Sequence, residues 1–220
     1  MTEFPDAESD NGLLRNPDLL NARRSRLLIV DLQQKLVPVI PDCPEILESV
    51  GFLLHAAGLT GVPAVISEQY PRGLGSTVAS ITALAGDVPR IEKVRFSAAE
   101  EFCRLIEAAP DMARDTLDSR DQIVVVGIET HVCVLQTALD LVGQGFRVYV
   151  VADAVAARHR TDHDWALKRM RDSSVTLCTA ESVAFEWCEV AGTDTFRAIS
   201  RLVRDRADRI RESAEKPVSE

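Results

Sequence analysis

The 220-residue sequence lacks three features that would direct it to a membrane, a secretory route or a nucleic acid. No apolar run approaches the ~20 residues that a membrane-spanning helix requires. Residues 1–6 are acidic and lack the basic-then-apolar order of a signal peptide. Acidic residues outnumber basic ones by 34 to 25, and the net charge of −9 disfavours nucleic acid or anionic lipid as a partner. We therefore expect a cytoplasmic protein that binds neither nucleic acid nor a membrane.

Cysteine is sparse, and glycine is missing where a nucleotide site would need it. The cysteines are Cys43, Cys103, Cys133, Cys178 and Cys188. Their number is odd and no two have CxxC spacing, which argues against a disulfide framework or a zinc cluster and favours a reducing compartment. Residues 32–35, which follow the first predicted strand, contain no glycine to cradle a phosphate. We expect neither a metal nor another cofactor.

Short apolar runs alternate with segments of helical spacing along the chain. Strands are predicted at residues 26–31, 62–67, 89–93, 123–126, 146–151 and 174–178. Helices are predicted at residues 45–57, 98–108, 112–117, 133–141, 161–171, 181–188 and 194–210. Alternating strands and helices, with strands apolar on both faces, predict a three-layer α/β/α sandwich around a mainly parallel, doubly wound, Rossmann-like sheet.

The segment boundaries predict one domain with two short extensions. Residues 16–210 would form the domain, between a flexible leader (1–15) and a C-terminal tail (211–220). Gly58 or Gly61 is expected to end the first helix, and Thr161 is expected to cap the helix that it opens.

Three chemically capable side chains occur where predicted strands end: Asp31, Lys93 and Cys133. Parallel strands bring their carboxyl ends to one edge, where ligands gather in open α/β sheets. Cys133 would lie in the first turn of a helix, whose N–H groups favour thiolate. An acid, a cation and a thiol supply what acyl transfer needs. Taken singly, Asp31 also fits a turn former, Lys93 a surface residue and Cys133 a small buried apolar residue.

Four motifs resemble those of the isochorismatase-like cysteine hydrolases, in the same order. They are residues 28–33 (LIVDLQ), 67–75 (SEQYPRGLG), 93–97 (KVRFS) and 127–133 (GIETHVC), the last followed by Gln136-Thr137-Ala138. The resemblance covers about residues 16–203. Within the family, the sequence is most similar to the subgroup without an assigned substrate. The resemblance implies that Asp31, Lys93 and Cys133 form a catalytic triad and that the peptide bond between Ile128 and Glu129 is cis.

Five further residues are candidates for contact with substrate. Gln33 follows Asp31 by two places, so in an extended segment it would point into the same pocket; capping of the next helix is the alternative. Through the resemblance only, Glu68, Tyr70, Phe96 and Ser97 are expected in the pocket wall. The backbone N–H groups of Glu129 and Cys133 are the candidates for an oxyanion hole.

Two departures from related families narrow the expected activity. Nicotinamidase-like members carry a metal-binding Asp-x-His soon after the second strand, whereas residues 67–70 here contain no histidine. True isochorismatases lack a nucleophilic cysteine at the position of Cys133. A metal-independent cysteine hydrolase, which cleaves a small amide or a related carbonyl substrate through an acyl-thioester on Cys133, is therefore expected. Vinyl-ether hydrolysis through Asp31, and a non-catalytic oligomeric scaffold, are the alternatives.

The remaining histidines and the C-terminal helix have less definite roles. His131 precedes Cys133 by two residues, about 200° around a helix, so it is a poor candidate for the catalytic base. His159 and His163 have the spacing of a metal pair but lie among arginines, which favours an exposed helix start. The resemblance implies a homo-oligomer. The apolar residues of the last helix would pack either in that interface or on the sheet of their own chain; they are Phe196, Ile199 and Leu202.

Overall fold

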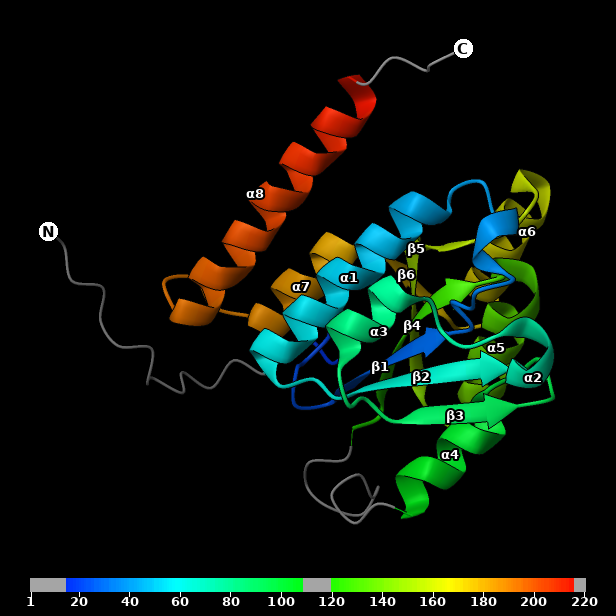
Figure 1. Cartoon of the computed structure of the whole chain (residues 1–220). Coiled ribbons are helices and arrows are strands. Elements are labelled where there is room, and N and C mark those ends of the chain that lie inside the picture. Colours follow the sequence, from blue (N-terminus) through cyan, green and yellow to red (C-terminus); the bar gives the residue numbers. More distant parts are fainter. Residues whose placement is uncertain (1–14, 109–119, 216–220) are drawn as a thin grey trace, which may run out of the picture.

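The structure is a computed structural model that describes residues 15–108 and 120–215 (Figure 1). The predicted helix at 112–117 lies outside these described residues, as do residues 1–14 of the leader and the last five residues of the tail. None of the described helices is both long enough and apolar enough to cross a membrane.

Six parallel strands form a single twisted sheet. They are β1 (Ser25–Val30), β2 (Ala64–Gln69), β3 (Arg90–Lys93), β4 (Gln122–Ile128), β5 (Arg147–Ala156) and β6 (Thr176–Cys178). The strand order is β3-β2-β1-β4-β5-β6, and every neighbouring pair is parallel. The predicted Rossmann-like sheet is therefore confirmed. Its order reverses between β1 and β4, and this switch point is where open sheets of this type form ligand crevices.

Helices cover both faces of the sheet, which gives the predicted three layers (Figure 1). The α-helices are α1 (Cys43–Thr60), α2 (Pro71–Leu74), α3 (Ala79–Ala85), α4 (Ala99–Ala108), α5 (Leu135–Gly143), α6 (Arg160–Arg171), α7 (Ala180–Cys188) and α8 (Asp194–Glu215). Two single turns, η1 (Val37–Val39) and η3 (Thr130–Val134), complete the described elements. Helices α1, α3 and α7 lie on one face, and α4, α5 and α6 on the other.

Strand β1 shows how the sequence produces these layers. Side chains alternate along a strand, so Leu27 and Ile29 join the core under α1, whereas Leu28 and Val30 join the core under α4 and α5. All four are fully buried. Each contributes about 1.5–3 kcal/mol of hydrophobic stabilisation, which fixes the central strand that carries the site.

Several local boundaries differ from the predicted ones. The predicted loop at 68–75 instead contains the end of β2 and the short helix α2. Helix α6 begins at Arg160 with His159 as N-cap, and His163 N already donates to His159 O, so Thr161 is not the cap. Gly61 ends α1 with a left-handed φ of 70°, which a glycine adopts without strain. Helix α8 continues past residue 210 to Glu215.

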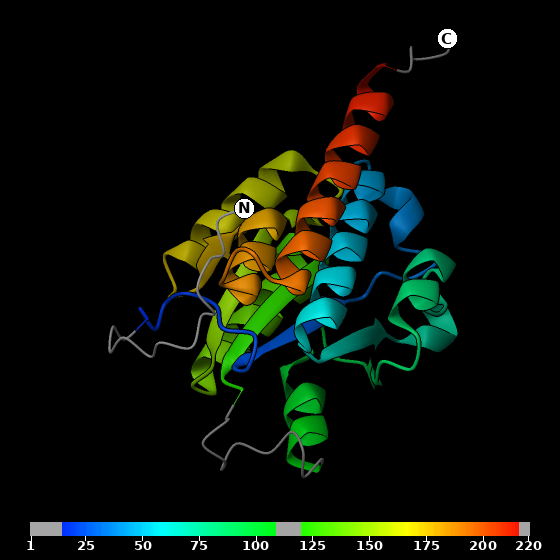
Figure 2. The same cartoon turned by 90° about the vertical axis from the view of Figure 1, so that its left-hand side faces the viewer.

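Helix α8 forms an additional layer outside α1 and α7 (Figure 2). Ile199 is fully buried with the α1 and α7 side chains, and Leu202 packs at the edge of the same cluster. The ring of Phe196 contacts that of Phe185, with centroids 6.5 Å apart. These apolar residues therefore pack within their own chain, on helices rather than on the sheet.

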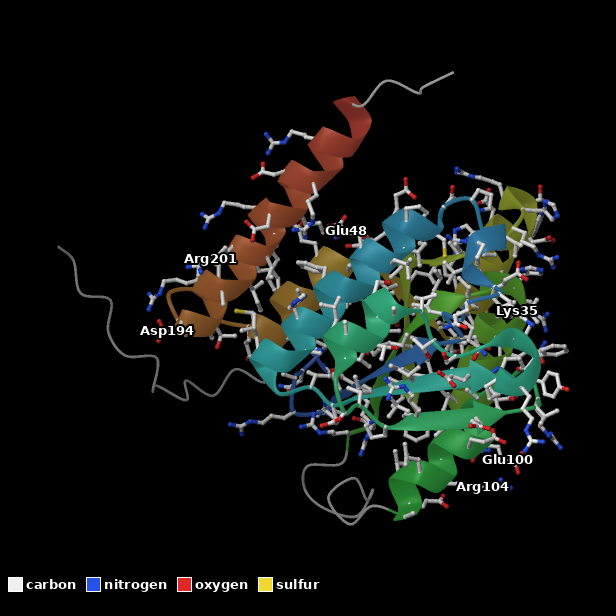
Figure 3. The ribbon with its side chains drawn as sticks, viewed as in Figure 1. Lys35, Glu48, Glu100, Arg104, Asp194 and Arg201 are labelled. Carbon is white, nitrogen blue, oxygen red and sulfur yellow. The ribbon has the colours of Figure 1, made fainter. Side chains whose placement is uncertain are left out.

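The outer side of α8 carries charged side chains. Figure 3 shows Arg201 on that side of α8, and Glu48 on α1.

Candidate active site

The site lies at the switch point, where β1 and β4 end side by side. Gly127 makes this approach possible: a Cβ at that position would lie 2.0 Å from Val30 O. Its φ of +114° is also a conformation that residues with side chains rarely adopt. The glycine therefore brings the end of β4 directly against the end of β1, which places the segment after β4 beside Asp31.

Asp31 follows β1 in a left-handed conformation, with φ 52°, which Asp tolerates better than most residues. Its side chain is fully buried. Ser67 Oγ donates to Oδ1 over 2.7 Å, and Lys93 Nζ donates to Oδ2 over 2.6 Å. Both carboxylate oxygens therefore accept a hydrogen bond, the arrangement that a buried carboxylate requires.

Lys93 ends β3 and is surrounded by acceptors. Besides Asp31 Oδ2, its ammonium group donates to Gln69 Oε1 (2.7 Å) and to the backbone oxygen of Phe96 (2.8 Å). An ammonium group has three donors and no acceptor, so this set of partners fits the charged form. Because both side chains of the Lys93–Asp31 pair are fully buried, the loss of either partner leaves an uncompensated charge.

Cys133 lies in the turn η3, in which Leu135 N donates to Thr130 O five residues back, rather than in a regular α-helical turn. It is only 6% exposed. Its thiol interacts with the side chains of both Asp31 and Lys93, so the structure brings the three predicted residues together.

The ionisation of Cys133 differs from the sequence expectation. Burial, followed by the charge of Asp31, raises its pKa to about 12, although the charge of Lys93 lowers it. The expected stabilisation of a thiolate by the helix start and by Lys93 is thus outweighed. At neutral pH the resting site contains a protonated thiol, so the nucleophile must be generated by proton transfer.

Gln33 and Glu68, both expected in the pocket wall, are buried and committed to other contacts. Gln33 Oε1 accepts from Gln69 N (2.7 Å), and its Nε2 donates to the backbone oxygens of Gln69 (3.0 Å) and Gly75 (2.6 Å). Glu68 Oε1 accepts from Thr77 N (2.7 Å) and Thr77 Oγ1 (2.6 Å). Both side chains therefore hold the segment after β2 in place by hydrogen bonds, and neither caps a helix.

The other three predicted wall residues lie at the carboxyl edge of β2 and β3. Tyr70 is 54% exposed and Phe96 is 53% exposed. Ser97 is buried, and its Oγ accepts from Ala99 N over 3.3 Å. A Cβ on Gly73 would meet the ring of Tyr70 at 2.3 Å, which shows how closely this ring lies on α2. Tyr70 and Phe96 thus present accessible apolar surface at the edge that carries the triad.

The peptide bond between Ile128 and Glu129 is cis, the geometry that the resemblance implied. The Glu129 carboxylate accepts from the backbone N–H of Arg158 (3.0 Å) and from its Nε (3.1 Å). Arg158 follows β5, whose Ala156 is the register partner of Ile128. This ion pair therefore connects the segment after β4 to the segment after β5.

His131 and His163 lie where η3 meets α6 and contact these two elements rather than the triad. His131 Nε2 lies 3.8 Å from the Asp162 carboxylate. His163 Nδ1 is 3.0 Å from Thr130 Oγ1, and burial lowers the pKa of His163. Across residues 15–108 and 120–215, no three His, Cys, Asp or Glu side chains are grouped as metal ligands.

Two residues of the site, Ser67 and Gln69, were not singled out from the sequence. Both belong to the 67–75 motif, and strand alternation places them on one side of β2, opposite Glu68. Ser67 is also the register partner of Val30, the neighbour of Asp31. Once strand order is known, this periodicity identifies them as the polar neighbours of Asp31 and Lys93.

Comparisons with known proteins agree with this architecture. A family model described as Isochorismatase domain matches residues 25–182. Isochorismatase domain-containing protein 2 of Xenopus laevis is 35% identical over 195 residues, which cover 88% of this chain and 90% of that protein. The secreted isochorismatase effector Isc1 of Phytophthora sojae (strain P6497) is 33% identical over 184 residues, covering 82% of this chain and 85% of that one.

A solved structure described as the MAR1 ribonuclease from Caenorhabditis elegans superposes with a TM-score of 0.73. It is 34% identical, and the match covers 84% of this chain and 92% of that one. Together with the family model, which spans most of the chain, these relatives show that the protein belongs to the isochorismatase-like hydrolase family.

Proposed function

We propose that this protein is a metal-independent cysteine hydrolase that cleaves a small amide or a related carbonyl compound through an acyl-thioester on Cys133. The observation that carries the proposal is the buried Asp31–Lys93 ion pair at the switch point, whose two side chains act electrostatically on the thiol of Cys133. A nucleophile next to a base that is itself held by a third group is the arrangement of covalent acyl transfer.

In the first step, Asp31 accepts the thiol proton as the sulfur attacks the substrate carbonyl carbon. Because the pKa of Cys133 is raised to about 12, this internal transfer supplies the thiolate that bulk ionisation does not provide at neutral pH. The fixed positive charge of Lys93 stabilises the thiolate as it forms.

In the second step, the backbone N–H groups of Glu129 and Cys133 would hold the tetrahedral oxyanion. The C–N bond breaks, the protonated Asp31 returns its proton to the leaving amine, and a thioester remains on Cys133. Water then attacks the thioester while Asp31 accepts a water proton. The acid is released, and the sulfur is reprotonated.

The test is turnover of a panel of small amides, measured as release of ammonia or amine, with acid-quenched samples examined by mass spectrometry. We expect an acyl adduct on Cys133 and the loss of both signals in Cys133→Ala. Cys43→Ala is the matched control, because Cys43 is also buried with a pKa raised to about 11 but lies on α1 and faces Asp42 and Glu45.

The alternatives are separated when a small vinyl ether is added to the panel. Vinyl-ether hydrolysis through Asp31 would persist in Cys133→Ala and would leave no adduct. A scaffold would release no product from any compound, although it would fold and assemble. A short RNA belongs in the panel because the C. elegans relative is described as a ribonuclease. The net charge of −9 leads us to expect no cleavage of it.

We also propose a homo-oligomer in a reducing, cytoplasmic environment. Cys43, Cys133, Cys178 and Cys188 are free thiols in the described structure, as such an environment requires. Light scattering of the purified protein tests the assembly, and fractionation of the source cells tests the location.

A further inference from the structure

We propose that Ser67 is a positioning residue that keeps Asp31 as an aligned carboxylate, ready to accept the proton of Cys133. This inference rests on the proposed function, in which Asp31 is the base. It assigns a task to a side chain that takes no part in the chemistry itself.

Ser67 holds Asp31 through two contacts. Its backbone oxygen accepts from Asp31 N over 3.1 Å, and its hydroxyl donates to Asp31 Oδ1 over 2.7 Å. Both residues are fully buried, so water does not compete for the carboxylate. An ionised carboxylate is an acceptor only, and the Ser67 hydroxyl is a side-chain donor that stabilises it beside Lys93.

Besides Ser67, the ionisable side chains that face Asp31 come from two other elements. Lys93 from β3 occupies Oδ2, and Cys133 from η3 supplies the proton to be moved. Glu68, the neighbour of Ser67 on β2, is turned to Thr77 instead. Loss of the Ser67 hydroxyl therefore removes a donor to Oδ1 without changing any charge in the site. The carboxylate then becomes less favourable relative to the neutral acid.

The experiment is the rate at which iodoacetamide alkylates Cys133, followed from about pH 4 to 8 by site-resolved mass spectrometry. The rate must be measured at Cys133 separately from the other cysteines, because Cys103, Cys178 and Cys188 are partly exposed and accessible to the reagent. The wild-type rate should be level near neutrality and fall toward acid pH. In Ser67→Ala this acid limb should move upward by about one to two pH units, the effect of one hydrogen bond to a charged group.

Matched variants separate positioning from general packing. Ser67→Thr keeps the hydroxyl and should show the wild-type limb. Ser67→Val has a side chain isosteric with that of Thr but no hydroxyl, so it should show the same shift as Ser67→Ala. The Thr and Val variants form a matched pair even if the alanine variant folds poorly. Ser25→Ala removes another buried serine hydroxyl, one bonded to Asn21 O and Gln122 Oε1 at the amino end of β1. It should leave the acid limb unchanged.

Two results would overturn the inference in distinguishable ways. An acid limb that is the same in wild type, Ser67→Ala and Ser67→Val would refute the role of Ser67 while leaving Asp31 as the base. A wild-type rate that rises about tenfold per pH unit throughout, with no level region near neutrality, would remove Asp31 as the base, and with it both this inference and the proposed mechanism.

Discussion

Replacement of Asp31 by Asn tests the internal proton transfer at the centre of the proposed mechanism. Asn keeps the shape of the side chain and tolerates the left-handed conformation with φ 52°. It cannot accept the thiol proton. We expect amide turnover to be lost and the pH dependence of Cys133 alkylation to change its form.

The magnitude follows from the pKa of about 12 for Cys133. A thiol with that pKa is ionised to about one part in 100,000 at pH 7, and its thiolate fraction rises about tenfold with each pH unit. In wild type, Asp31 takes the proton internally, so the alkylation rate should vary by less than about twofold between pH 7 and 9. In Asp31→Asn only the free thiolate reacts, so the rate should rise with pH, by up to about tenfold per pH unit while the pH lies below the thiol pKa. Loss of Asp31 removes a charge that raises this pKa and leaves Lys93 to lower it, so the thiol of the variant ionises more readily than that of the wild type.

The assay is the slope of the logarithm of the alkylation rate against pH, measured at Cys133 by mass spectrometry. Equal slopes in wild type and Asp31→Asn would refute the role of Asp31 as the base. Stability must be followed in parallel, because the single variant leaves the buried ammonium of Lys93 without a counterion. That loss should cost about 3–5 kcal/mol, and the double variant Asp31→Asn/Lys93→Met should recover much of it in urea unfolding.

Three further predictions concern the framework around the site. Gly127→Ala should fail to fold or lower the free energy of unfolding by more than about 3 kcal/mol, because the new Cβ would lie 2.0 Å from the backbone oxygen of Val30. The control Gly58→Ala is exposed on α1 with no neighbour within 4 Å, and it should raise the free energy of unfolding in urea by about 0.5–1 kcal/mol. Arg206→Met removes a hydrogen bond of 3.0 Å to Asp153 and should lower stability by about 1–3 kcal/mol, with faster hydrogen exchange in α8; unchanged exchange there would contradict the anchoring role. Burial lowers the pKa of His163 in the folded protein. As the pH falls, this histidine therefore takes up a proton in the unfolded chain before it does so in the folded one. The stability that neutral His163 contributes is complete above about pH 6.5 and declines below that pH. His163→Gln should therefore flatten the loss of stability between pH 7.5 and 5.5, and an identical slope would refute this origin.

The layered fold could be predicted because its signals are local. Apolar runs of strand length and helical spacing between them are properties of neighbouring residues, and a parallel sheet covered on both faces is the arrangement that buries both patterns. The same rule placed Asp31, Lys93 and Cys133 at one edge, since parallel strands all end there. The boundaries were less exact. Thr161 is not the cap of α6, and the segment after β2 contains a helical turn.

The protonation state and the division of roles required contacts between segments distant in the chain. Cys133 is a thiol at rest because burial and Asp31 together outweigh Lys93, a balance of distances that no local pattern encodes. Gln33 bonds to the backbone of Gln69, because the segment after β2 folds back over it. Residue types and their order thus specify which groups meet at the edge of the sheet. Strand order and side-chain packing set the separations on which ionisation and hydrogen bonding depend.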